Sequence, residues 1–483
     1  MSSINRAWWG AILAILSATS VFGEDRYQVN YSRTFTYRGG RVTVDHGFGD
    51  VVVVTESGSQ VNVHATIRAS DPEFGKQIRV TSAETGNGIS VRTDYPEHYS
   101  HSGNFSYSVD YRITVPPNAP LSVRNRFGSI DATGVKAPSE FSNAQGSIRL
   151  RDMQGSQKVE NSFGSIEISD AVGGALTVKN ANGSIAVRNA TTVDATDRFA
   201  SVEIFDAKGD VNVKNANGNV TVRNVNGSAK VVTSFASVGA YDIGGVADIT
   251  NGNGRVELRS VGNNAAIATT FGSVTAADIK GNLAVAAQNS KVEVSSVKGN
   301  AIVGTTFGAV DVRDIGGPVR ITNENGSITA NNTGQVTART RLASVTARDI
   351  RGSADVENAN GSVQLNNVGG DAKVRTSFGS AFVRGVNGTV DIQNQNGAIG
   401  VAGMRAGGCK PVTLKTSFSS IKIAVPSSAS YSINARTTYG RINSDLPITT
   451  QTVSDETLIG TIGGGSCRME LSNQNGSITI EHD

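Results

Sequence analysis

The stretch GNVTVRNVNGSAKVVTSFASVGAYDIGGVADITNGNG, residues 218–254, contains the pattern that decides the fold. A small residue recurs every nine positions, and the second and fourth residues after it are apolar, as Val220 and Val222 are after Gly218. This period-two alternation is typical of a short strand with one buried face, and the Asn, Asp and Gly residues between the strands favour turns. Two strands and two turns therefore make one unit of eighteen residues.

The eighteen-residue unit repeats along most of the chain, inside a longer period of thirty-six. A phrase with an aromatic and a small residue recurs at this longer period from Phe127 to Phe307, and Asn-Gly phrases lie midway between its copies. Self-similarity at a short period is typical of a solenoid, in which each coil buries its apolar face only against its neighbours. We therefore predict an all-β fold: a single-stranded parallel β-helix, or β-solenoid, with about 18 residues per coil, capped by a small N-terminal β region.

The chain begins with the pattern of a secretory signal peptide. A single cation at Arg6 precedes an apolar stretch from Ala7 to Val21, and small residues follow it. This stretch is too short to span a membrane as a helix. We therefore expect an exported protein, periplasmic, on the cell surface or extracellular, with no membrane span in the mature chain. The predicted parts are a signal peptide at 1–23, an N-terminal β-rich cap region at 24–120, the β-solenoid repeat array at 121–445, and a loop excursion with a C-terminal closing coil at 446–483.

Charge is nearly balanced along the chain. The sequence has 44 Lys and Arg residues against 41 Asp and Glu residues, a formal net charge of +3, and it contains no basic run. Proteins that bind nucleic acid or an anionic membrane surface concentrate their cations in patches or runs. We therefore expect neither of these partners.

Cys409 and Cys467 are the two cysteines of the chain. Both follow glycine runs at matching points of the coil, and an oxidising compartment favours a disulfide between them. Their sequence spacing predicts positions two or more coils apart, which is farther than the usual Cα separation of a bridge unless a loop bends back. A disulfide and two free thiols both remain open.

Short phrases at the flanks of the repeat array carry a family resemblance. They are a strand ending in a Val-Pro turn, at Val115 and Pro116 and again at Val425 and Pro426, and coils marked by a small residue followed by Ser-Ile, at Gly128 to Ile130 and Asn475 to Ile478. In these features the chain resembles the bacterial putative-adhesin family, an exported β-solenoid domain of unknown function. The resemblance covers almost the whole mature chain. It implies a binding or scaffold role and supplies no catalytic residues.

A row of phenylalanines is the first candidate for a ligand site. If the rings faced outward, their regular spacing would allow them to stack on successive units of a glycan. If they faced inward, they would plug one end of a thin core, and the large area that a ring buries favours this second interpretation. The row consists of Phe163, Phe199, Phe235, Phe271, Phe307 and Phe378.

Metal binding is the second candidate. Calcium-binding nine-residue repeats need the pattern GGxGxDxUx, but each coil here offers at most one recurring Asp, as in YDIGG, and lacks the preceding glycines. His98 and His101, near Asp94 and Glu97, are spaced like metal ligands, although a polar loop has the same composition. We therefore predict no metal site and no cofactor.

Catalysis is not expected from this sequence. The coils contain Ser, Thr, Asn and isolated charges in strict register, with no nucleophile motif and no His in the array. We predict an exported, adhesin-like scaffold that binds an unknown protein or glycan of the cell envelope. One alternative is a polysaccharide-active β-helix enzyme, whose carboxylates would have to come from loops at 94–104 or 446–466. The other is a purely structural envelope protein.

Overall fold

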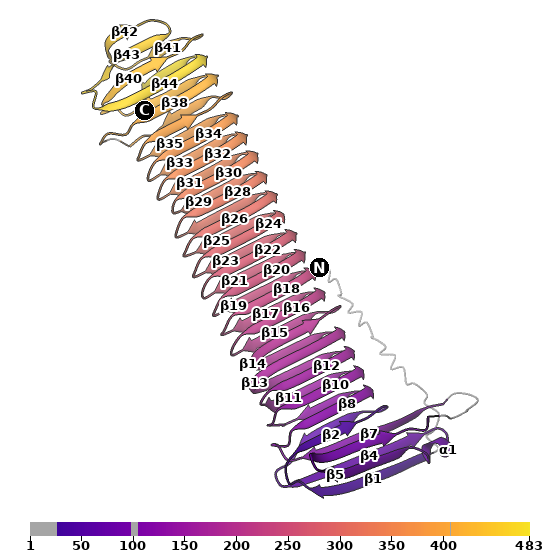
Figure 1. Cartoon of the computed structure of the whole chain (residues 1–483). Helices are drawn as coiled ribbons and strands as arrows, with labels where there is room; N and C mark the ends of the chain where they lie inside the picture. Colours follow the sequence, from indigo (N-terminus) through magenta and orange to yellow (C-terminus); the bar gives the residue numbers. More distant parts are fainter. Residues whose placement is uncertain (1–26, 98–104, 406) are drawn as a thin grey trace, which may run out of the picture.

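The computed structural model describes residues 27–97, 105–405 and 407–483, so the predicted signal peptide at 1–23 lies outside the described residues. The described chain forms a long rod of stacked strands (Figure 1). The predicted parallel β-solenoid is confirmed, with about 18 residues in each of about 17 turns. The only helix within these ranges is α1 (Pro72–Gly75), and no described helix is long and apolar enough to cross a membrane.

Each coil consists of two strands. β18 (Ala229–Phe235) and β19 (Val238–Ile243) form one coil, and β20 (Ala247–Asn253) and β21 (Val256–Val261) form the next. β18 pairs in parallel with β20, and β19 pairs in parallel with β21. The even-numbered strands therefore build one face of the rod, which we call sheet A, and the odd-numbered strands build the opposite face, sheet B.

Both sheets run along almost the whole rod. Besides β18 and β20, sheet A contains β8 (Leu121–Phe127), β10 (Ser139–Gln145), β12 (Gln157–Phe163), β16 (Val211–Asn217), β22 (Ala265–Phe271), β24 (Leu283–Asn289), β26 (Ala301–Phe307), β28 (Val319–Asn325), β30 (Val336–Leu342), β32 (Ala354–Asn360), β34 (Ala372–Phe378), β36 (Val390–Gln393) and β38 (Val412–Phe418). Besides β19 and β21, sheet B contains β9 (Ile130–Thr133), β11 (Ile148–Gln154), β15 (Val202–Ala207), β17 (Val220–Val225), β23 (Val274–Ile279), β25 (Val292–Val297), β27 (Val310–Ile315), β29 (Ile328–Thr333), β31 (Val345–Ile350), β33 (Val363–Val368), β35 (Ala381–Val386), β37 (Ile399–Ala402) and β39 (Ile421–Val425). Two longer strands, β13 (Ile166–Asn182) and β14 (Ile185–Asp197), contribute to both sheets.

The core is a stack of small aliphatic pairs. Val231 and Val238 are at most 1% exposed, and each lies beside the equivalent residue of the next coil, Val231 beside Ile249 and Val238 beside Val256. A single coil is too thin to exclude water from both faces of these side chains. Stacking therefore supplies most of the apolar burial that stabilises the rod.

Two polar ladders lie where each coil turns, and the first of them satisfies backbone carbonyl groups. At the first turn, from sheet A to sheet B, the buried Asn251 donates from Nδ2 to the carbonyl oxygens of Ala236 and Gly254, both at 3.1 Å. At the second turn, Asn224 Nδ2 donates to Asp206 Oδ1 at 2.9 Å. From Asp170 to Asp349 a neutral residue separates each Asp of this ladder from the next, which keeps these like charges about 9.6 Å apart. Asp152 and Asp170, by contrast, lie on adjacent coils.

The N-terminal region caps one end of the solenoid core. β2 (Arg41–Asp45) and β3 (Val51–Thr55) pair in parallel with β8 and β9, so the parallel stack extends into the region before Leu121. β6 (Gly88–Asp94) and β7 (Tyr107–Val115) continue this stack, because they pair in parallel with β2 and β3. Antiparallel strands complete this end of the rod (Figure 1): β5 (Arg79–Thr85) pairs with β6, β4 (Gln60–Ala69) pairs with β7, and β1 (Tyr27–Thr36) pairs with β4.

The C-terminal end is stacked out of chain order. The last coil, β44 (Cys467–Asn475) and β45 (Ile478–His482), pairs with β38 and β39 on one side. On its other side it pairs with the coil formed earlier in the chain, β40 (Tyr431–Arg436) and β41 (Ile442–Ser444). A hairpin of β42 (Thr449–Val453) and β43 (Thr457–Ile462) extends the outer sheet through β40.

This inverted order explains the geometry of the cysteines. Cys409 and Cys467 are joined by a disulfide, with their Cα atoms 5.1 Å apart. The prediction that they lie two or more coils apart is wrong, because β44 returns to stack directly on β38 and places Cys467 on the neighbouring coil. The described chain has no free cysteine.

Candidate functional site

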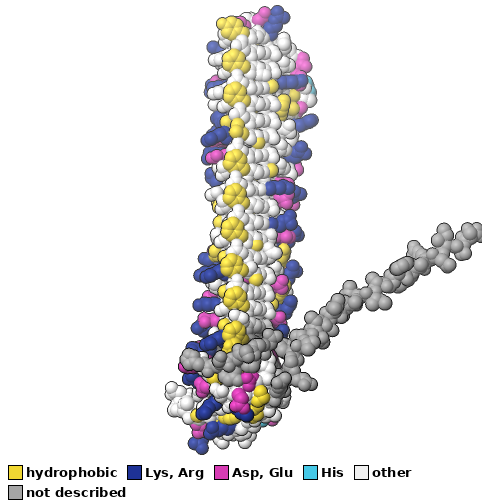
Figure 2. Space-filling model, turned by 90° about the vertical axis from the view of Figure 1, so that its right-hand side faces the viewer, with side chains coloured by type: hydrophobic (Ala, Val, Ile, Leu, Met, Phe, Trp, Pro, Cys, Tyr) yellow, Lys and Arg dark blue, Asp and Glu magenta, His cyan; other side chains and the backbone are white. Residues whose placement is uncertain are grey.

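The phenylalanines of the repeat form an exposed column along one edge of the rod. Phe163, Phe235 and Phe307 are 54%, 57% and 51% exposed. The prediction that the row fills the core is therefore wrong. In Figure 2 the rings lie one above another on the edge that faces the viewer.

The physical reason for this exposure lies in the polar ladder at the first turn. Along β18, Val231 and Thr233 point inward, and strict alternation would place Phe235 inward as well. The buried side chain of Thr233, in line with Asn251 of the next coil, closes the core before the ring position is reached. The backbone then turns, and the ring is left outside.

Rings and amides alternate in this column. Phe235 lies beside Asn253 of the next coil, and Asn253 lies beside Phe271. Consecutive rings are thus two coils, about 9.6 Å, apart, with one carboxamide between them, except that Leu342 replaces the ring between Phe307 and Phe378. We call this set the aromatic column. From β16 to β38 it comprises Asn217, Phe235, Asn253, Phe271, Asn289, Phe307, Asn325, Leu342, Asn360, Phe378, Asn396 and Phe418.

A second line of side chains follows the column two residues further along each turn. Ser237 and Ser273 occupy this line in the coils that carry rings, and the exposed cations Arg255 and Lys291 occupy it in the coils between them. Flat apolar rings, amides and hydroxyls therefore share one narrow surface. Sugars present the matching groups, because the C–H face of the ring stacks on an aromatic side chain while the hydroxyl groups hydrogen-bond to amides.

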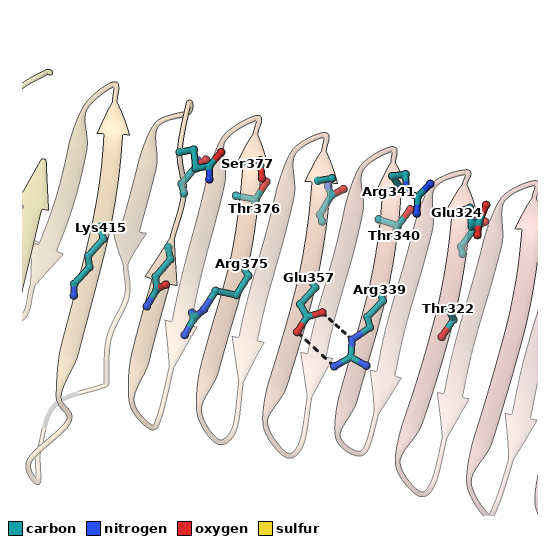
Figure 3. A pocket seen from close by; sticks show the side chains of 16 residues that line it. Thr322, Glu324, Arg339, Thr340, Arg341, Glu357, Arg375, Thr376, Ser377 and Lys415 are labelled. Atoms are coloured by element: carbon teal, nitrogen blue, oxygen red, sulfur yellow. Dashed lines mark hydrogen bonds and ion pairs between the residues drawn. The ribbon is translucent and has the colours of Figure 1, made fainter. Parts of the chain in front are cut away.

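The face of sheet A beside the column is hollowed into shallow grooves. The groove near the C-terminal end, about 780 Å³ in volume, is charged (Figure 3). In it Arg339 Nε donates to Glu357 Oε2 at 2.9 Å. Arg375 also lines the groove, and its Nη2 lies 2.6 Å from Oδ2 of Asp391, which is outside the lining. The groove over the middle of the rod, about 970 Å³, has instead a floor of small uncharged residues such as Ala268, Ala286 and Gly304.

The described residues do not form a recognisable catalytic or metal centre. No group of three His, Cys, Asp or Glu side chains converges within the described ranges, and His98 and His101 lie outside them. Burial raises the pKa of Asp197, but this carboxyl occupies a position in the polar ladder and accepts a hydrogen bond from the Ala200 N–H at 2.8 Å. Its environment is that of a turn-capping group.

Residues 319–481 match the family model Toastrack DUF4097. This part of the chain is similar to the Toastrack family. It runs from β28 to β45 and contains Leu342, Phe378 and Phe418 of the aromatic column as well as the C-terminal end of the rod. The match confirms the resemblance to a β-solenoid family of unknown function that the flanking phrases indicate.

Solved structures named as adhesins align with all or part of this chain. A cell adhesion protein described as putative, from Clostridium sporogenes, is 7% identical, with a TM-score of 0.17, over 95% of this chain and all 100% of its own. A putative adhesin from Bacteroides fragilis is 13% identical, with a TM-score of 0.19, over 57% of this chain and 97% of its own. A putative adhesin from Parabacteroides merdae is 9% identical, with a TM-score of 0.21, over 56% and 95%. No curated protein matches the chain in sequence.

Proposed function

We propose that this chain is an exported, adhesin-like scaffold without catalytic activity, and that it binds a linear glycan of the cell envelope or the extracellular surroundings along the aromatic column. The observation that carries the proposal is the regular alternation of exposed rings and carboxamides along one edge of the rod. Exposed aromatic side chains cost solvation free energy unless a partner covers them, and a row of them on a rigid support is typical of a binding surface.

The geometry favours an extended glycan over a compact ligand. The rings are set on strands of a rigid sheet, about 9.6 Å apart, so each ring meets a separate unit of a chain that lies along the rod. No acidic side chain lies in the column itself, and Asn253 and Asn289 present donors and acceptors between the rings. A neutral polysaccharide matches this combination, whereas a polyanion would need more cations than Arg255 and Lys291.

Removal of three neighbouring rings tests the proposal. We expect Phe235→Ala, Phe271→Ala and Phe307→Ala, combined in one variant, to weaken glycan binding about 100-fold, because each stacked ring contributes about 1 kcal/mol. Binding is measured on a glycan array and then by titration with the polysaccharide that is captured. Phe382→Ala is the control, because this ring is 48% exposed on sheet B, outside the column.

Three outcomes would contradict the proposal. Equal affinity of the triple variant and the unchanged chain would place the site elsewhere. Shortened or unsaturated glycan products would favour the polysaccharide-active enzyme. Capture of no glycan by the unchanged chain would favour a purely structural role. Circular dichroism of the triple variant shows whether the rod is still folded.

A further inference from the structure

The middle of sheet A carries an uncharged face, hollowed by the shallow groove described above. Every outward-facing side chain of β22, β24 and β26 is small or neutral, and Ile302 is 54% exposed. Charged residues return on both sides of these three strands. The nine residues of this face, which we call the neutral patch, are Ala266, Ala268, Thr270, Ala284, Ala286, Gln288, Ile302, Gly304 and Thr306.

We propose that the neutral patch packs against the same patch of a second copy of this chain, with the two rods antiparallel and related by a two-fold axis that runs along β24. Under this axis, β22 faces β26 of the other copy, β20 faces β28, β16 faces β32, and β14 faces β34. Such a contact is isologous, so each pair of facing residues occurs twice.

The side chains at the centre of this contact are complementary in size. The axis places Ile302, the largest side chain of the patch, against the small side chain of Ala266, which occupies the same position on β22. It places Ala284, Ala286 and Gln288 against their own copies, so short side chains meet at two of these positions and two carboxamides meet at the third. Large against small is the arrangement that fills space between two packed sheets.

Charges on either side of the patch are complementary under the same axis. Asp248 on β20 faces Arg320 on β28, because each is the second residue of its strand. The uncharged strands alone set the position of the axis, so the match between Asp248 and Arg320 supports that position independently. Arg320 has no ion-pair partner within the described part of the chain, whereas Asp248 already lies 3.5 Å from Lys230. A partner copy would therefore supply the acidic neighbour that Arg320 lacks.

The charge match is absent where β18 faces β30, because Lys230 meets Thr337 and Val232 meets Arg339, and it resumes farther out. Lys214 on β16 faces Glu357 on β32, and Asp194 on β14 faces Lys373 on β34. The axis would bring Glu140 and Glu470 together still farther out, so the favourable contact ends before β10 and β44. Opposite charges of this kind select one register out of the many in which two repetitive rods could slide.

The size of the face is sufficient for a stable dimer. Sheet A from β14 to β34 spans about 50 Å along the rod and about 16 Å across, so each copy contributes about 800 Å², the area of a standard interface. Figure 1 shows the strands of this section lying nearly parallel, which allows the two faces to stay in contact over this length. The aromatic columns of the two copies then lie on the same side of the dimer and remain accessible.

The mass of the purified chain in solution tests the proposal. We expect a dimer at micromolar concentration by sedimentation velocity. Ala286→Lys places like charges across the axis and is expected to raise the dimer dissociation constant about 100-fold. Ala286 is exposed, so circular dichroism should show an intact rod.

Charge reversal tests the register. Arg320→Asp alone is expected to raise the dissociation constant about tenfold, and the double variant Asp248→Arg with Arg320→Asp is expected to restore it. A monomer at every concentration, or a dimer that tolerates Ala286→Lys, would overturn the proposal. Failure of the double variant to recover affinity would overturn the antiparallel register. None of these results depends on glycan binding.

Discussion

At the scale of single residues, close stacking of consecutive turns explains why small residues recur in the sequence. Gly254 has a φ of 129°, and a Cβ added to it would lie 2.2 Å from the carbonyl oxygen of Ala236 in the preceding coil. Ala236 adopts a φ of 139°, so a methyl group is accommodated there at a cost in strain. Glycine is the residue that reaches this conformation without that cost.

Gly254→Ala should therefore destabilise the rod by about 1–3 kcal/mol, through strain and contact with the neighbouring carbonyl. Urea unfolding measures the change in the free energy of unfolding, at a protein concentration low enough to keep the chain monomeric. Gly304→Ala is the matched control on sheet A, because its φ is not positive and the nearest atom to its added Cβ is 3.9 Å away. We expect the control to be neutral or slightly stabilising. Equal effects of the two substitutions would contradict the role of stacking at the turn.

At the scale of an element, the N-terminal region depends on a buried histidine. His46 is 5% exposed, its Nδ1 lies 3.1 Å from Thr93 Oγ1, and its ring packs edge-on against Tyr111. Burial lowers the pKa of His46 to about 4, although the backbone of Val109 and the nearby Asp110 oppose this effect. The imidazole is therefore neutral in the folded protein at pH 7.

The N-terminal region should lose stability in mild acid. The unfolded chain binds a proton at His46 near pH 6.5, whereas the folded chain does so only near pH 4. The free energy of unfolding of this region is therefore at its full value above about pH 6.5, and it declines by about 3 kcal/mol as the pH falls to about 4. Hydrogen exchange of β2 to β7 between pH 7 and pH 4.5 measures this decline.

His46→Phe is the control for this titration. It keeps an aromatic ring against Tyr111 but cannot bind a proton, so its exchange rates, corrected for intrinsic pH dependence, should change much less over the same range. If the unchanged chain and His46→Phe respond equally to acid, another group is responsible. Carboxylates that titrate in the same range affect both proteins alike.

At the scale of the whole molecule, the rod is held together by contacts between neighbouring coils. Val238 is 1% exposed and lies between Val220 and Val256 of the adjacent coils. A disturbance at this point separates two long blocks of intact coils, because solenoid stability is approximately the sum of local terms.

Val238→Asp should therefore break the cooperativity of the rod near its middle. A buried, unpaired carboxylate costs several kcal/mol, and we expect calorimetry to show two transitions, with proteolytic cleavage near the substituted coil. Val246→Asp is the control, because Val246 is 39% exposed at a turn. A single transition of unchanged midpoint in Val238→Asp would contradict the observed register.

Much of this architecture, including the row of phenylalanines, could be predicted from periodicity, but the outward direction of the rings could not. The nine-residue spacing predicts coil length, parallel pairing and the inward direction of pairs such as Val220 and Val222, because each depends only on local alternation. The same alternation predicts an inward Phe235, and the buried Thr233 overrides it. The sequence also could not show that Cys467 lies beside Cys409, because β44 stacks between β38 and β40 although it follows both in the chain.

The alternation of rings and amides restricts how such a rod can change in length. Duplication of a single coil that carries a ring would set Phe beside Phe and bring two aspartates of the second turn together, whereas duplication of a coil between them would set Asn beside Asn. Duplication of two coils preserves both alternations and shifts everything beyond by about 9.6 Å, the interval between rings. Gain or loss of length is therefore compatible with an unbroken column only in steps of two coils, and each step adds or removes one ring.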